Sequence, residues 1–300
     1  MAVMDMGASV LAKLKNKAQK SGKPLQLHLQ LFCQEEFLRR LSLSDYADNL
    51  ILKGGLFIYT LTNFESRATV DVDFLLRQIP ADISQMKSII DSILAAKTGN
   101  DFITFTSQGY EEISPQRKYK GLSLQIVGHI KNTRTPFSVD IGIGDVIVPK
   151  AEQRVIPVQL DDFEAPTVMT YSLESTIAEK FDAILQRLQL TSRMKDFYDI
   201  YYLSNTFDFN GGRLRQAIFE TLQNRGTPYE ADSLEKISAF AEEHEMLMQW
   251  RRFIKRAKLP EYSFDEVLRG INMFLRPVWQ SIVSEQDLSR RWTATKAVWE

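Results

Sequence analysis

The segment from residue 69 to residue 76 alternates between apolar and polar side chains, and this period limits the fold more than any other feature of the chain. Three apolar side chains fall on one side: Val70, Val72 and Phe74. Asp71 and Asp73 fall on the other side. Because neighbouring side chains point to opposite faces of a β-strand, we predict a strand that packs its apolar face onto a core and projects both carboxylates from the other face.

The spacing of apolar residues in the rest of the chain predicts a mixed sheet followed by helices. Further strands are predicted at 50–52, 101–108, 120–130 and 136–143, and the sheet is expected to end near Pro157. Helices are predicted at 5–20, 25–41, 56–61, 81–97, 173–190, 194–204, 212–224, 232–256 with a break, and 264–284. We therefore expect an α+β chain with two lobes, a mixed α/β lobe over 1–165 and a helical lobe over 166–300.

The composition excludes several classes of protein. Cys33 is the only cysteine among the 300 residues, so neither an intrachain disulfide nor a cysteine-rich zinc site is available, and the three histidines lack ligand spacing. No apolar run approaches the roughly 20 residues of a membrane span, and the first residues lack the apolar stretch of a secretory signal. We expect a cytoplasmic protein that does not associate with a membrane.

Acidic side chains on neighbouring strands predict a metal site. Asp71 and Asp73 repel each other across one face unless a cation lies between them. Asp140 falls in a second alternating strand, at residues 137–141. Oxygen ligands favour a hard ion such as Mg²⁺ or Mn²⁺, and three such carboxylates are enough for two ions. A lone Asp-x-Asp, however, is commonly just the polar face of an ordinary strand.

Glycines before the acidic strand favour phosphate binding. Gly54 and Gly55 open the short predicted helix, where backbone N–H groups approach phosphate oxygens without interference from a Cβ atom. Arg67 and Thr69 add a guanidinium and a hydroxyl beside the acids. Gly142-x-Gly144 lacks the third glycine and the helix of a dinucleotide loop, so we interpret it as a turn.

These motifs together resemble one family. Leu52-Lys53-Gly54-Gly55 followed by Arg67-Ala68-Thr69-Val70-Asp71-Val72-Asp73-Phe74 is similar to the first motif of AbiEii-type nucleotidyltransferases, the toxin halves of abortive-infection toxin–antitoxin pairs. Residues 36–42 and 46–48 are similar to the family's N-terminal helix, and 179–184 and 193–200 to its later motifs. The resemblance covers about residues 5 to 205, and the last third matches only in being helical.

The resemblance implies a fold and a reaction. The fold would be a polymerase-β-like nucleotidyltransferase core with N-terminal helices over 1–165, and a helical lobe over 166–300 that completes the active-site cleft. The reaction would be Mg²⁺- or Mn²⁺-dependent transfer of a nucleotide from an NTP to an acceptor, of which tRNA 3′ ends are known in the family. A cognate antitoxin would be encoded nearby.

The resemblance also assigns roles to residues. Asp71, Asp73 and Asp140 would bind the metals, and Lys180 would neutralise the phosphates as a fourth catalytic residue. The nucleotide would be bound by Lys53, Gly54, Gly55, Arg67, Thr69, Asp196 and Asp199. Polymerase-β-like enzymes usually have Gly-Ser where this chain has Gly54-Gly55, which leaves phosphate contact there to the backbone.

Other interpretations remain open from the residues alone. The chain is alternatively an inactive nucleotidyltransferase-like scaffold that acts as a binding module, or an enzyme that modifies a protein or a small molecule. The residues alone are equally consistent with Lys180 as an ordinary surface cation. They are equally consistent with Asp196 and Asp199 as ion-pair partners of Arg193 and Lys195. Cys33 and the aromatic residues at 197–202 are more typical of core packing. Basic clusters at 13–23 and 251–258 are either solvated helix faces or phosphate-binding surfaces.

Overall fold

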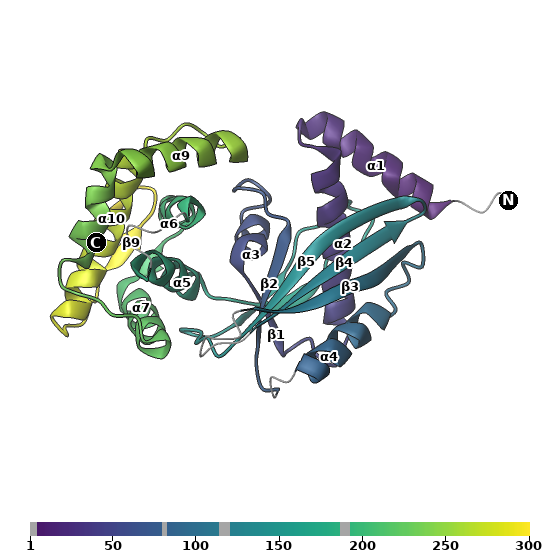
Figure 1. Cartoon of the computed structure of the whole chain (residues 1–300), viewed down its shortest axis with the longest axis horizontal. Coiled ribbons are helices and arrows are strands. Elements are labelled where there is room, and N and C mark those ends of the chain that lie inside the picture. Colours follow the sequence, from purple (N-terminus) through teal and green to yellow (C-terminus); the bar gives the residue numbers. More distant parts are fainter. Residues whose placement is uncertain (1–4, 80–82, 114–120, 187–192) are drawn as a thin grey trace. The chain divides into compact units, whose positions relative to one another are not determined.

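The computed structural model describes residues 5–79, 83–113, 121–186 and 193–300 (Figure 1). The chain divides into two compact units. The first consists of the residues up to Gly144 together with Ala151–Tyr171, and the second of Asp145–Lys150 together with Ser172–Glu300. Among the described residues, no helix is both long enough and apolar enough to cross a membrane.

A mixed sheet forms the centre of the first unit. In the described part of the chain it contains β1 (Leu50–Lys53), β2 (Asp71–Leu76), β3 (Ile103–Ile113), β4 (Gly121–Ile130), β5 (Thr133–Ile143), β6 (Glu152–Val155) and β7 (Thr167–Thr170). Their order is β3-β4-β5-β2-β1-β7-β6. β2 runs parallel to β5 and β1 parallel to β7, whereas the other neighbouring pairs are antiparallel. The predicted α+β class is confirmed.

The sheet continues beyond Pro157, where we expected it to end. β6 and β7 form an antiparallel pair, and Thr170 of β7 lies opposite Leu52 of β1. β7 has only four residues, Thr167–Thr170, too few to show a clear period in the sequence. The predicted lobe boundary after residue 165 falls between β6 and β7.

The described residues of the first unit form four helices: α1 (Met6–Ser21), α2 (Leu25–Ser42), α3 (Gly54–Leu61) and α4 (Ile83–Ala95). Helix α2 covers the apolar face of the sheet, where the ring of Phe37 lies 6.0 Å from that of Phe74 and 6.3 Å from that of Phe137. Alternation along β2 therefore turns Asp71 and Asp73 to the opposite face. Residues 81–82 of the predicted helix at 81–97, and residue 120 of the predicted strand at 120–130, lie outside the described residues.

Helix α2 also buries charged side chains. Glu36 is fully buried, yet its carboxylate accepts hydrogen bonds from Arg39 (2.9 Å), Arg40 (3.2 Å) and Asn100 (2.7 Å). A fully buried carboxylate is tolerated here because Glu36 has these hydrogen-bond donors. The stretch that resembles the family's N-terminal helix therefore contributes to the core of the first unit. Neighbouring Glu35 is also buried, and burial raises its pKa to about 8 although Arg39 opposes the shift.

The second unit is helical, as predicted. It also contains a small sheet that the sequence analysis did not predict. Its helices are α5 (Leu173–Leu185), α6 (Met194–Thr206), α7 (Gly211–Arg225), α8 (Ser233–Ser238), η2 (Ala239–Glu242), α9 (His244–Ala257) and α10 (Phe264–Val283). The additional strands are β8 (Phe209–Asn210), β9 (Arg291–Thr293) and β10 (Val298–Trp299). Trp292 and Trp299 pack against Phe274 of α10, which ties the C-terminal strands to the helices. Residues 187–190 of the predicted helix at 173–190 lie outside the described residues.

Candidate functional site

The predicted carboxylates lie together on one face of the first unit's sheet. In the parallel pair β2–β5, Asp73 lies opposite Asp140, and Asp71 lies opposite Ser138. Residues directly opposite each other in a sheet project from the same face, and neighbouring strands are about 4.8 Å apart. Asp71, Asp73 and Asp140 are all half-buried, so the face is not sealed beneath apolar side chains.

Serine hydroxyls orient two of these acids. Ser138 Oγ donates a hydrogen bond to Asp71 Oδ1 at 2.6 Å, and Ser123 Oγ of β4 donates to Asp140 Oδ1 at 2.6 Å. Each bond fixes the position of one carboxylate oxygen. Sequence analysis did not identify either serine, although Ser138 falls on the polar side of the same strand as Asp140.

The donor set fits a hard divalent cation. Among the described residues, no three acidic, histidine or cysteine side chains converge on one point as a ready-made metal centre. Magnesium, however, is usually held by one or two carboxylates and completes its shell with waters and substrate phosphates. Asp73 and Asp140, in register on adjacent strands, supply two such carboxylates, and Asp71 supplies a third two residues along β2.

The two glycines bring helix α3 into close contact with the acidic strand. An ideal Cβ atom on Gly54 would lie 2.0 Å from Asp73 Oδ2, and Gly54 has a φ of +67°. A Cβ atom on Gly55 would lie 2.9 Å from Thr69 Oγ1. The first turn of α3 therefore approaches Asp73 and Thr69 as closely as only glycine permits.

Lys53 places a cation on the acidic face. It lies opposite Asp73 in the antiparallel pair β1–β2, and its Nζ atom reaches Gly142 of β5 on the far side of β2. The same ammonium lies 5.2 Å from the ring centroid of Tyr171. A cation from the chain itself thus accompanies the three carboxylates. Arg67, half-buried, lies in the segment between α3 and β2.

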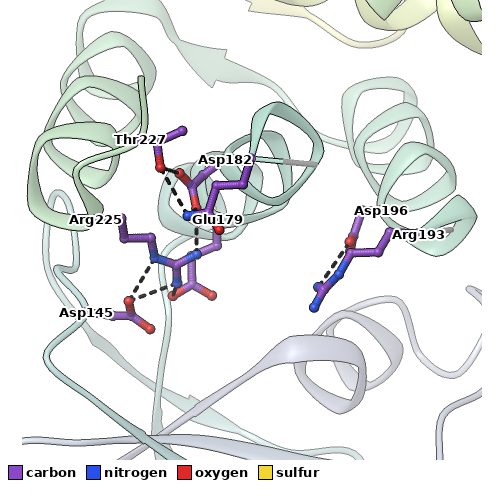
Figure 2. Close-up of polar contacts among 8 residues, drawn as sticks. Asp145, Glu179, Asp182, Arg193, Asp196, Arg225 and Thr227 are labelled. Carbon is purple, nitrogen blue, oxygen red and sulfur yellow. Dashed lines mark hydrogen bonds and ion pairs between the residues drawn. The ribbon is translucent and has the colours of Figure 1, made fainter. Parts of the chain in front are cut away.

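The predicted residues of the second unit form an ion-paired cluster. Lys180 Nζ of α5 lies 3.1 Å from Asp196 Oδ1 and 2.5 Å from Asp199 Oδ2 of α6. Both carboxylates are buried, and Asp196 also pairs with Arg193 at 3.4 Å (Figure 2). The structure thus brings Lys180, Asp196 and Asp199 together by mutual pairing, and the nucleotide-binding role of each stays a prediction.

A second cluster in this unit centres on Arg225, which sequence analysis missed. Its guanidinium contacts Asp145 (2.8 Å), Glu179 (3.0 Å) and Asp182 (2.9 Å), as Figure 2 shows. Although burial alone would lower it, the pKa of Arg225 is raised by these carboxylates. Thr227 donates a further hydrogen bond to the fully buried Asp182. The contact with Asp145 explains why residues 145–150 belong to the second unit.

Three residues with candidate chemistry prove to be core. Cys33 is fully buried, and burial raises the pKa of its thiol to about 12, so it carries little thiolate at neutral pH. Phe197 and Tyr198 of α6 are also buried. The prediction of core packing is confirmed for these residues.

Comparisons with known proteins agree with this geometry. A family model described as the nucleotidyl transferase AbiEii toxin of type IV toxin–antitoxin systems matches residues 36–270. Among solved structures, the nucleotidyltransferase toxin MenT4 of Mycobacterium tuberculosis H37Rv is similar, with a TM-score of 0.55 and 15% identity over 92% of this chain and 99% of that chain.

JHP933 of Helicobacter pylori is also similar, with a TM-score of 0.46 and 12% identity over 84% of this chain and 91% of that chain. A comparison with curated protein sequences finds no match. The likeness to MenT4 confirms the nucleotidyltransferase fold.

Proposed function

This chain belongs to the AbiEii family of nucleotidyltransferase toxins, and we propose that it transfers a nucleotide from an NTP to an acceptor hydroxyl at the acidic face of its sheet. One observation carries the proposal. Asp73 and Asp140 lie opposite each other on parallel strands, and the first turn of α3 packs directly against Asp73. Carboxylates and helix amides at one place suit a metal-bound triphosphate.

We propose Mg²⁺ or Mn²⁺ as the cofactor, held by Asp71, Asp73 and Asp140. Carboxylate oxygens are the hard ligands that these ions prefer. When bound, the ions would lower the pKa of the attacking hydroxyl and neutralise charge on the departing pyrophosphate. Ser138 and Ser123 orient Asp71 and Asp140 before any ligand arrives.

The residues around the acids are proposed to position the triphosphate. The amides of Gly54 and Gly55 at the start of α3 donate to phosphate oxygens, and the dipole of the helix favours the negative charge. Lys53 and Arg67 add positive charge in the same unit. Lys180, held by Asp196 and Asp199, is proposed to bind nucleotide phosphates. Most of the rate gain would then come from positioning and charge neutralisation.

We propose an RNA 3′ end, such as that of tRNA, as the acceptor. The family resemblance supports this choice, and a hydroxyl on a polyanion suits a chain with cationic helix faces. The family description also supports a toxin whose effect is opposed by a cognate antitoxin. Growth of a bacterial host should therefore stop when the parent chain is expressed, and resume when the neighbouring antitoxin gene is co-expressed.

A labelling experiment tests the reaction. The parent protein is incubated with each α-labelled NTP, Mg²⁺, total RNA and cell lysate, and the labelled species are separated by size and by nuclease and protease sensitivity. We expect nuclease-sensitive label from the parent and from the control variant Asp101→Asn, an exposed acid outside the site. Asp73→Asn should lower labelling by roughly 10²–10³-fold.

Other outcomes assign other functions. Protease-sensitive label would identify a protein acceptor, and label in a small molecule would identify a metabolite acceptor. Absence of label together with no stabilisation by Mg²⁺ and NTP would favour the inactive binding scaffold. Equal labelling by Asp73→Asn and the parent would contradict the proposal.

A further inference from the structure

Helix α9 ends in a cluster of exposed cations. Arg251, Arg252, Lys255 and Arg256 lie on its surface, and Lys258 follows at its C-terminal cap. We call these five residues the α9 ridge. Within the part of the chain that the structure describes, no side chain of the ridge forms an ion pair or a hydrogen bond. Glu245, in the first turn, is the only acidic residue of the helix.

Several surface cations elsewhere in the second unit have acidic partners. Five examples are Lys236–Glu230 (2.5 Å), Arg269–Asp265 (3.0 Å), Arg276–Glu235 (3.5 Å), Arg291–Asp208 (3.1 Å) and Lys296–Glu300 (2.5 Å). The ridge differs from these pairs because it gathers five cations at one end of a helix without an acidic partner among the described residues. Helix-dipole stabilisation accounts for cations in the last turn, such as Lys255 and Arg256, but it does not account for Arg251 and Arg252 in the middle of the helix.

The opposite face of α9 is used by the core. Met246, Trp250 and Ile254 are buried, and Trp250 Nε1 donates a hydrogen bond to the Tyr262 carbonyl at 2.8 Å. The indole also stacks on Phe264 at 5.1 Å. Because these apolar residues are occupied inside the protein, α9 cannot insert an apolar face into a lipid surface, and only its charges are presented outward.

We propose that the α9 ridge binds the phosphate backbone of the RNA acceptor, an inference that rests on the proposed function. Arg251 and Lys255 lie one helical turn apart, as do Arg252 and Arg256, so the ridge presents two rows of cations spaced by about 5–6 Å. Three of the five cations are arginines, whose planar guanidinium binds phosphate oxygens in pairs.

The ridge lies beside elements that the proposed function already uses. Helix α9 packs against α6, the helix of Asp196 and Asp199 (Figure 1). The ring of Phe253 in α9 lies 6.1 Å from that of Tyr198 in α6. Phe253 is half-buried next to the cations. Cations flanked by a partly exposed aromatic ring are typical of surfaces that bind single-stranded nucleic acid.

Two charge-matched variants of the full-length protein test this proposal. The ridge variant carries Arg251→Gln, Arg252→Gln, Lys255→Gln and Arg256→Gln, and the control carries Arg213→Gln, Arg269→Gln, Arg290→Gln and Lys296→Gln, exposed positions of the same unit. Glutamine keeps a helix propensity close to that of arginine and lysine. Circular dichroism and thermal unfolding check that both variants fold.

Binding is measured by fluorescence anisotropy with a 3′-labelled single-stranded RNA and with a tRNA, at several salt concentrations. At about 0.1 M salt we expect the ridge variant to bind roughly 100-fold more weakly than the parent, and the slope of log K against log[salt] to fall by about 3, near 0.7 for each contact with a single strand. The control should bind like the parent. An unchanged affinity and slope for the ridge variant, or an equal loss in the control, would overturn the proposal.

A second titration, with lipid vesicles, tests whether the ridge binds RNA or an anionic lipid surface. Vesicles of phosphatidylserine and phosphatidylcholine are titrated under the same conditions, and ridge-dependent binding to vesicles without ridge-dependent binding to RNA would contradict the RNA assignment. Failure of the proposed function is recognised separately. If Asp73→Asn and the parent label alike, the catalytic assignment fails, and the anisotropy result still decides the role of the ridge.

Discussion

Asp73 on β2 lies directly opposite Asp140 on β5, and the backbone of Gly54 packs against the Asp73 carboxylate so closely that a Cβ atom on Gly54 would lie 2.0 Å from Asp73 Oδ2. The spacing of glycine and acid along the sequence thus becomes direct contact in the fold. The acidic pair, the tight turn and the start of α3 form one structural unit, so a change at any of them should alter the others.

Gly54→Ala should be strongly destabilising and should reduce nucleotide transfer. The left-handed backbone costs about 1–2 kcal/mol for a residue with a Cβ atom, and the overlap with Asp73 adds roughly 1–3 kcal/mol. Gly99→Ala is the matched control, because Gly99 also has a positive φ (+80°) but an added Cβ would meet nothing within 4 Å. Urea unfolding measures both variants. An equal loss of unfolding free energy in both variants would show that the contact between Gly54 and Asp73 does not affect stability.

Arg225→Met should destabilise the second unit by about 3–5 kcal/mol, because it leaves Asp145, Glu179 and Asp182 without their shared cation. The control Arg269→Met removes a side chain that is 70% exposed and paired with Asp265, and should cost less than about 1 kcal/mol. Guanidinium unfolding followed by tryptophan fluorescence suits the test, since all four tryptophans lie in this unit. Similar losses in both variants would refute a central role for Arg225.

Stability should depend on the protonation of Glu35. Its pKa rises from the ordinary 4.5 to about 8 on folding, mainly through burial. Between these values the folded chain keeps a proton that the unfolded chain releases, so this contribution to stability is present below about pH 4.5 and is lost as the pH rises through about 8. Glu35→Gln should therefore be more stable than the parent at pH 8, on the order of a few kcal/mol.

The advantage of Glu35→Gln should shrink toward pH 5, and urea unfolding at pH 5, 6, 7 and 8 measures it. Glu65→Gln, at an exposed site of the same unit, serves as the control and should follow the parent at every pH. A difference between Glu35→Gln and the parent that does not vary with pH would rule out titration of this carboxylate.

Lys180→Met should weaken NTP binding in the presence of Mg²⁺ by roughly tenfold or more if Lys180 binds the phosphates as proposed. Stability alone would not separate this role from ion pairing with Asp196 and Asp199. Nucleotide affinity of the folded variant is therefore measured by titration calorimetry, with Lys180→Arg as the conservative control. If the folded Lys180→Met protein binds NTP as tightly as the parent, Lys180 has only a structural role, as the ion-pair partner of Asp196 and Asp199.

Local periods explain which parts of the fold could be predicted. The alternation of Val72 and Phe74 with Asp71 and Asp73 reports burial on one face, and the structure packs Phe74 against Phe37 on that face. Gly54 and Gly55 were predicted to open a helix, and α3 begins at Gly54. What the sequence did not reveal is why they are needed, namely the close approach of α3 to Asp73 and Thr69.

Long-range pairing explains what was missed. Arg225 shows no motif, and its contact with Asp145 joins positions 80 residues apart. β7 and the strands β8 to β10 are too short for a visible period, and they exist because neighbouring strands or aromatic residues such as Trp292 hold them. The ion pairs of Lys180 depend on the packing of α5 against α6, which spacing along one helix does not specify.

Binding of Mn²⁺ measured by electron paramagnetic resonance, with and without a non-hydrolysable NTP analogue, tests the metal site most directly. We predict that the parent and Asp101→Asn bind Mn²⁺ more tightly with the analogue, and that Asp140→Asn and Asp73→Asn each lose at least about tenfold in that affinity while remaining folded. Equal Mn²⁺ affinity in Asp140→Asn, Asp73→Asn and the parent would contradict the account, and would leave Lys53 as the cation that balances these carboxylates.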